Sequence, residues 1–336
     1  MRKVTGITIS LRPCSEIFKR RSRAIIFLIL LGTPVVLNSL SPHAEGSSCD
    51  IPITCKAYGP QVPDCSYNPA IGVPHYPDCN GPSVWVDDTH DNGQKITPLS
   101  VDEPGRFWGF AALLARDGFT VINSKAPLAQ LSPENAPDIL VVANAQSVIG
   151  AVDAFTAAEV DAITSWVVQG GSLLLIFDHA PFNGVNTLLS RFELELSPHG
   201  VDTQSENVFR RSDGTLNRSA YASNGSSKSE VVNEVTSFRG SSFAISAERT
   251  GESIHTPLLT FAPGATGVVM GLNVSIAGRL QGVQVELGAG RAIVLAEAAM
   301  FTAQISAQGA PTGMHQTIDN EQFLLNIMHW LADSAP

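Results

Sequence analysis

The chain has 336 residues, with 21 Lys and Arg against 31 Asp and Glu, and its formal net charge is −10 at pH 7. The basic residues gather at the start, because the first 23 residues hold seven of them and one acid. Without residues 1–45 the chain keeps 14 basic and 29 acidic side chains, a net charge of −15. Such a surface repels a phosphate backbone, and no basic cluster offsets this, which excludes nucleic acid as a partner.

The basic start is followed by an apolar run from Ala24 to Leu40, the order that is typical of a secretory signal peptide. The run contains Pro34 and Asn38 and is shorter than the roughly 20 apolar residues of a bilayer-spanning helix. We therefore expect residues 1–45 to be a signal peptide cleaved near Ala44 and the protein to be extracytoplasmic, either periplasmic or secreted. The alternative is an uncleaved anchor, through which alone the chain would contact a membrane.

Residues 46–82 hold four cysteines and seven prolines, and no cysteine follows them. An even number of cysteines in an exported chain predicts two disulfides, with three possible pairings among Cys49, Cys55, Cys65 and Cys79. A zinc site is the alternative, but no two of them have C-x-x-C spacing. The prolines disfavour helices and central strands, so this segment is predicted to be a loop-rich cap.

Residues 83–333 alternate short apolar runs with helical patterns, which indicates one α/β domain. Continuous apolar runs predict parallel strands covered on both faces, at Val84 to Asp88, Phe119 to Asn123, Ile139 to Asn144 and Ser172 to Asp178. Crossover helices are predicted over Arg106 to Asp117 and after a capping box of Thr156 and Glu159. This order predicts a flavodoxin-like, doubly wound, mostly parallel sheet with helices on both faces.

The second half of the domain begins with residues 182–250, whose Ser, Asn, Gly and Arg content predicts a loop-rich insertion. Four more strands are predicted after it, at Pro257 to Phe261, Gly267 to Leu272, Gly282 to Leu287 and Ala292 to Ala296. Gly288-Ala289-Gly290 should join the last two in a hairpin. A final helix should run from Asn320 to Ala332, capped by Asp319 with Gln322.

Polar side chains follow the predicted strands, at the edge where open α/β sheets bind ligands. We expect a catalytic group at this edge, formed by His90, His179, Asp88, Asp178 and Glu297, with Asn92 and Asn144 binding a ligand. The alternative for the Asp and Asn residues is that they cap loops or helices.

Two reaction chemistries fit this group. A divalent metal held by His90, His179 and Asp88 would lower the pKa of a bound water. Without a metal, a histidine would act as a general base oriented by an acid. No nucleophile is evident, because G-x-S-x-G does not occur and no cysteine beyond the leader lies near a strand end.

Five stretches resemble a poorly characterised branch of the class I glutamine amidotransferase-like superfamily. They are Val86 to Asn92 (V-D-D-T-H-D-N), Phe110 to Val121 (F-A-A-L-L-A-R-D-G-F-T-V), Gly170 to Pro181 (G-G-S-L-L-L-I-F-D-H-A-P), Gly288 to Phe301 (G-A-G-R-A-I-V-L-A-E-A-A-M-F) and Asn320 to Leu331 (N-E-Q-F-L-L-N-I-M-H-W-L). The resemblance implies the same α/β fold. In the amidotransferases the strand that resembles Ser172 to Phe177 leads into a turn bearing the nucleophilic Cys. This chain has Asp178-His179 there, so a glutaminase reaction through a thioester is not expected.

Two functions remain open from the sequence. One is an exported hydrolase in which His90 and His179 share one ligand, with Asp88 or Asp178 orienting at least one ring. The other is a non-catalytic domain of the cell envelope that binds a small molecule or glycan.

Overall fold

The computed structural model describes residues 49, 51, 53–59, 61–69, 71–97, 105–146, 153–179, 184–197, 203, 207–217, 232–317 and 319–333. All of them belong to one compact unit, Gly46–Pro336. The expected leader, residues 1–45, lies outside the described residues. Within the described ranges, no helix combines the length and apolar character that crossing a bilayer requires.

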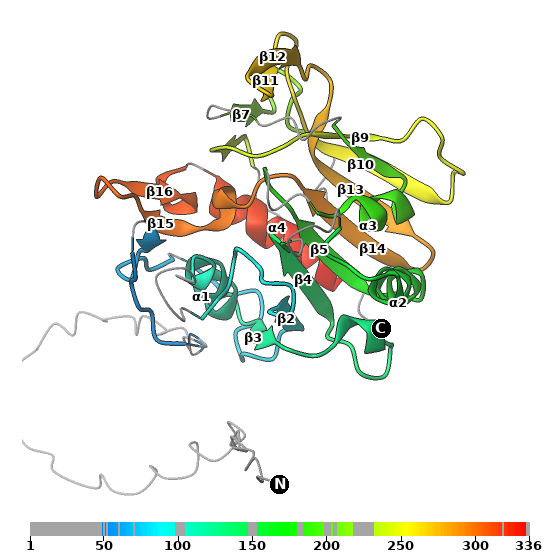
Figure 1. Cartoon of the computed structure of the whole chain (residues 1–336). Coiled ribbons are helices and arrows are strands. Elements are labelled where there is room, and N and C mark those ends of the chain that lie inside the picture. Colours follow the sequence, from blue (N-terminus) through cyan, green and yellow to red (C-terminus); the bar gives the residue numbers. More distant parts are fainter. Residues whose placement is uncertain are drawn as a thin grey trace, which may run out of the picture. The chain divides into compact units, whose positions relative to one another are not determined.

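Nine strands of the described chain form one mixed sheet (Figure 1). Five of them are parallel and lie in the order β3-β2-β4-β5-β14. Their bounds are Ser83–Asp87 (β2), Thr120–Ser124 (β3), Ile139–Ala143 (β4), Ser172–Ile176 (β5) and Gly290–Leu295 (β14). The four expected parallel strands are therefore present, and the mixed α/β class is confirmed.

Antiparallel strands continue the sheet beyond β14. β13 (Leu280–Leu287) pairs with β14, with β10 (Ser253–Thr260) and, at one residue, with β9 (Phe243–Ile245), and β9 pairs with β6 (Leu194–Leu196). The expected hairpin of the last two strands is confirmed as β13 and β14. Glycine is required in its turn, because Gly288 has φ 62° and a Cβ there would lie 2.5 Å from the carbonyl oxygen of Val168.

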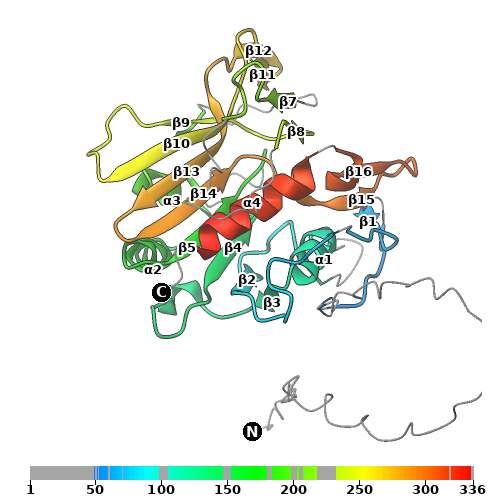
Figure 2. The same ribbon diagram turned by 180° about the vertical axis from the view of Figure 1, so that it is seen from behind.

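Helices cover both faces of the sheet. α1 (Trp108–Arg116) and α4 (Asn320–Ala332) pack into one core, and α2 (Ala157–Val168) and α3 (Asn186–Arg191) into the other. Figure 2 shows α4 lying in front of the sheet in the view from behind. Side chains of β5 alternate between the two cores, Ile176 toward α1 and α4 and Leu175 toward α2.

Local sequence signals predict the cap of α2 but not that of α4. α2 begins with the expected capping box, in which Thr156 and Glu159 bond each other's backbone amides. α4 has the predicted bounds, but the predicted cap is wrong, because the Asp319 side chain makes no cap bond to the helix. Its Oδ2 instead accepts from the amides of Asn233 and Glu234, which lie far away in sequence.

The expected insertion contains regular structure where it is described. It holds α3, β6, β9 and an antiparallel pair of β7 (Asn207–Arg210) and β8 (Glu234–Ser237). The strand expected at Gly267 to Leu272 is in fact a hairpin of β11 (Thr266–Val269) and β12 (Leu272–Ser275).

The cysteine-rich segment is tied by two disulfides, Cys49–Cys79 and Cys55–Cys65, which confirms the disulfide prediction over the zinc site and settles the pairing. Disulfides are typical of oxidising, extracytoplasmic compartments. A small sheet joins the segment to the C-terminal part, formed by β1 (Val62–Pro63), β15 (Ala303–Ile305) and β16 (Pro311–Gly313). The described part of the chain also contains three short 3-10 helices: η2 (Leu128–Gln130), η3 (Ala299–Phe301) and η4 (Met314–Gln316).

Candidate functional site

The carboxyl ends of β5 and β14 bring Asp178 and Glu297 together. Ile176 of β5 pairs with Leu295 of β14, so Asp178 and Glu297 stand at matching positions two residues further on. Ile176 and Leu295 both lie in the core under α1 and α4, and the ladder continues through the amide of Phe177. By the alternation of side chains along a strand, the two carboxyl groups lie on this face of the sheet.

Glu297 is a fully buried carboxyl group. Its Oε1 accepts from the amide of Ala299 at 2.7 Å and its Oε2 from the amide of Met300 at 2.9 Å. Burial, and then the negative charge of Asp178, raise the pKa of Glu297 well above its ordinary value of 4.5 despite these bonds. Burial and the nearby charge of Asp178 therefore favour the protonated form of Glu297.

The segment after β8 covers Glu297. A Cβ on Gly240 would lie 2.3 Å from the carbonyl oxygen of Ala296 and 2.7 Å from Cγ of Glu297. Ser241 and Ser242 follow and are fully buried. Glu297 is therefore enclosed by this segment and is not exposed to a ligand.

Asp178 links Glu297 to the more exposed His179. Oδ1 of Asp178 lies 2.6 Å from Nδ1 of His179 and also accepts from the His179 amide at 2.7 Å. Oδ2 accepts from the amide of Ala298 at 3.4 Å. The Asp178 side chain is 9% exposed and that of His179 29% exposed. A carboxylate bound to Nδ1 fixes the orientation of the ring, as in a general base with an orienting acid.

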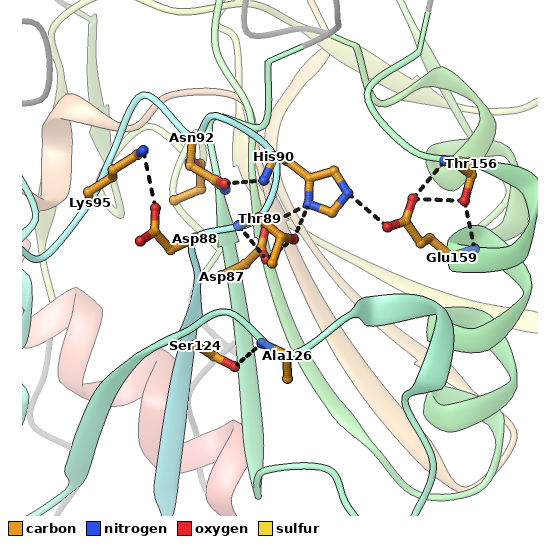
Figure 3. A network of polar contacts seen from close by, with 11 residues as sticks. Asp87, Asp88, Thr89, His90, Asn92, Lys95, Ser124, Ala126, Thr156 and Glu159 are labelled. Carbon is orange, nitrogen blue, oxygen red and sulfur yellow. Dashed lines mark hydrogen bonds and ion pairs between the residues drawn. The ribbon is translucent and has the colours of Figure 1, made fainter. Parts of the chain in front are cut away.

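His90 belongs to a second polar cluster, shown in Figure 3. Its Nδ1 lies 2.8 Å from Oδ2 of Asp87, and its Nε2 lies 3.3 Å from Oε1 of Glu159 on α2. Burial lowers the pKa of His90, but the two carboxylates outweigh it and the pKa is raised above 6.5. The His90 side chain is only 7% exposed, so both ring nitrogens are used within the protein.

The structure gives His90 and His179 separate carboxylate partners. Asp178 orients the ring of His179, as expected, whereas Asp88 orients neither ring and pairs with Lys95 at 3.1 Å and Lys125 at 3.6 Å. The ring of His90 is held instead by its nearer neighbour Asp87.

No metal-binding set emerges at the strand ends. Nowhere in the described part of the chain do three or more His, Cys, Asp or Glu side chains form a group that could hold a metal ion. His90, His179 and Asp88 therefore do not form a ligand set for a divalent ion. Asp88 forms an ion pair with Lys95, and His90 lies between the carboxylates of Asp87 and Glu159.

The two asparagines expected to bind a ligand differ in their contacts. Asn92 holds its own loop, since its Oδ1 accepts from the His90 amide and its Nδ2 donates to the carbonyl of Ala143 at 3.3 Å. Asn144 has φ 56° and is 2% exposed, and its Oδ1 is buried without a hydrogen-bond partner. Asn92 thus fits the capping alternative, while Asn144 keeps an unused acceptor at the end of β4.

Sequence reasoning missed two members of the His90 cluster. Asp87 precedes His90 by three residues, a spacing that a turn after a strand can close and that could have identified the pair. Glu159 was recognised as the partner of Thr156 in the capping box, but nothing local indicates that its Oε1 also reaches His90.

No known protein family's sequence profile matches the chain. No curated protein matches it either. Among solved structures, it is similar to the mmIFT52 N-terminal domain, with 14% identity and a TM-score of 0.48 over 74% of this chain and 97% of that one. A putative ThuA-like protein from Bacteroides uniformis ATCC 8492 is 10% identical, with a TM-score of 0.44 over 79% and 94%. An exo-beta-1,4-mannosidase from Opitutaceae bacterium strain TAV5 is 13% identical, with a TM-score of 0.37 over 75% and 36%. The function proposed below therefore rests on the residues of this chain.

Proposed function

We propose that the chain is an exported hydrolase in which His179 is the general base, Asp178 its positioning residue and Glu297 the neutral acid behind them. The observation that carries the proposal is the Asp178–His179 hydrogen bond at the carboxyl end of β5, with an imidazole that is partly exposed. Open α/β sheets bind their ligands at this edge.

The reaction needs one proton transfer in its first step. His179 takes a proton from water on Nε2 while Nδ1–H stays bonded to Asp178, and the resulting hydroxide attacks the electrophilic atom of the substrate. The leaving group receives the proton as its bond breaks. The negative charge of Asp178 stabilises the imidazolium, and neutral Glu297 adds no second negative charge beside it. General-base catalysis of this kind contributes about 10²- to 10⁴-fold.

The proposal gives His90 another role. With Asp87 on one ring nitrogen and Glu159 on the other, His90 joins the loop after β2 to the start of α2. It stabilises the edge of the sheet and does not contact substrate.

A second candidate is a domain that binds a small molecule or glycan without catalysis. It is favoured by the buried, unpartnered Oδ1 of Asn144, which lacks a donor that a ligand hydroxyl or amide could supply.

We further propose that the chain is a flavodoxin-like, doubly wound relative of the class I glutamine amidotransferase-like superfamily. The strand order β3-β2-β4-β5-β14 and the helices on both faces support this, since the order along the chain reads 2-1-3-4-5. Export through the N-terminal leader is supported by the two disulfides.

The test is a panel of chromogenic esters, glycosides and phosphates. The protein should hydrolyse at least one class, and His179→Ala should abolish that turnover. His255→Ala is the matched control, because His255 lies on β10 with Nε2 bonded to the carbonyl of Phe192. Turnover that survives in a folded His179→Ala variant would contradict the proposal, and a wild type inactive on every class would favour the binding domain.

A further inference from the structure

The hairpin of β11 and β12 carries two exposed apolar side chains at its tip. Met270 is 88% exposed and Leu272 is 70% exposed, and the pair is separated only by Gly271. The other large exposed hydrophobics of the described chain stand singly along the sequence: Val73, Ile122, Val168 and Ile254. The β11–β12 hairpin lies at the top of the view in Figure 1, away from the parallel strands β2, β3 and β4.

The turn of this hairpin is an unfavourable place for methionine. Val269 pairs with Leu272, so the turn has two residues, and Met270 and Gly271 have φ 49° and 80°. Such turns favour Asn, Asp or Gly, because side chains rarely adopt a positive φ. An exposed Met gains little packing within the chain to offset this strain. Residues held in such backbone conformations cluster at functional sites.

The hairpin is also uncharged, and two of its valines pack against the core. The 17 residues from Ala262 to Gly278 include no Asp, Glu, Lys or Arg. Val269 and Val274 pack against the core, which fixes the direction of the tip. Met270 and Leu272 therefore form a small, anchored apolar wedge without charges to desolvate.

We propose that this wedge inserts into the surface of a lipid bilayer with neutral headgroups. A stable protein interface buries about 800 Å² on each partner, far more than two side chains provide, whereas a bilayer accepts single apolar side chains in proportion to their area. The headgroups of the bilayer should be neutral, because a chain of net charge −10 is repelled by anionic lipid. This site is separate from the proposed hydrolase site and does not depend on it.

The experiment places a fluorescent reporter at the tip of the full chain. Met270→Trp and Leu272→Trp are compared with Ile254→Trp, whose side chain is 65% exposed on β10 and is the matched control. Each variant is mixed with phosphatidylcholine vesicles whose acyl chains carry bromine, which quenches tryptophan inside the bilayer. The signal of the four native Trp is subtracted with the wild type. Near-ultraviolet circular dichroism checks folding.

Quenching at single positions distinguishes insertion of the hairpin from binding by the leader, whose apolar run can bind vesicles by itself. Quenching and a blue shift at positions 270 and 272, with neither at 254, are the expected result. Unquenched emission at 270 and 272 overturns the proposal, whether or not the protein binds the vesicles. The wedge would then be expected to contact a groove on another protein. Equal quenching at 254 also overturns it.

Discussion

Both histidines at the sheet edge are held by a carboxylate, but their surroundings give them different properties. His90 has a second carboxylate, Glu159, on its other nitrogen and is 7% exposed. His179 is 29% exposed and is held by Asp178, whose neighbour Glu297 has a pKa raised well above 4.5. The first arrangement favours the protonated form of a buried ring, and the second leaves its ring partly exposed. The role that we propose for each histidine rests on this difference.

Replacing His90 should make stability less dependent on pH. His90→Gln should lower the free energy of unfolding by about 1–3 kcal/mol near neutral pH, because Asp87 and Glu159 lose a buried donor. The pKa of His90 is raised in the folded state, so its stabilisation is complete below the ordinary 6.5 and is lost as the pH rises through the raised value. Urea unfolding of both proteins over a pH series measures this. A difference that stays constant with pH would contradict the assignment, and His255→Gln controls for loss of a histidine that faces a carbonyl group.

Asp178 and Glu297 should be coupled in titration. Asp178→Asn should lower the pKa of Glu297, because the negative charge that raises it is removed, but not to 4.5, because Glu297 stays fully buried. Infrared titration of the carboxyl C=O band measures the change, and the band is identified by its loss in Glu297→Gln. An unchanged titration in Asp178→Asn would show that burial alone sets the pKa of Glu297.

At the scale of elements, the segment after β8 depends on the small size of Gly240. Gly240→Ala should lower the free energy of unfolding by about 1–3 kcal/mol, because its methyl group overlaps the Ala296 carbonyl and the Glu297 side chain. Gly72→Ala is the control, since no atom lies within 4 Å of a Cβ there and its φ is ordinary. Thermal or denaturant unfolding compares the two. Equal effects would mean that the segment does not pack on Glu297 as described.

The elements of this fold differ in how well their sequence predicts them. The four parallel strands and α2 follow from local signals, namely continuous apolar runs and a capping box. The role of Asp319 was not predictable, because its partners Asn233 and Glu234 come from the insertion. The β11–β12 hairpin was missed because Met270-Gly271 lacks the Asn or Asp that marks such turns.

Only the part of the candidate site that depends on local sequence could be predicted. Asp178 and His179 are adjacent in sequence, so their contact required no knowledge of the fold. The joint site of His90 and His179 required the register of β2 against β5, two strands separated by β4, and the contact of α2 with the loop after β2. These are tertiary contacts that no local pattern specifies.

At the scale of the whole molecule, the two disulfides of the cysteine-rich segment should stabilise the folded chain. Replacing both cysteines of Cys49–Cys79 by Ser should lower the free energy of unfolding by about 3–4 kcal/mol, and those of Cys55–Cys65 by about 2–3 kcal/mol, because the first closes a longer loop in the unfolded chain. Denaturant unfolding of the two double variants measures the order. Non-reducing peptide mapping of the exported protein checks the pairing, and free thiols there would refute both bonds.

The separation of the two histidine clusters is tested most directly by comparing His179→Gln with His90→Gln in the hydrolysis panel, with turnover expressed per folded molecule. We predict that His179→Gln folds normally and loses about 10²- to 10⁴-fold in turnover, as expected for a lost general base. His90→Gln should keep its turnover and lose stability. An equal loss of turnover in folded His90→Gln would mean that the two rings serve one site, and the assignment of His179 alone as the base would be wrong.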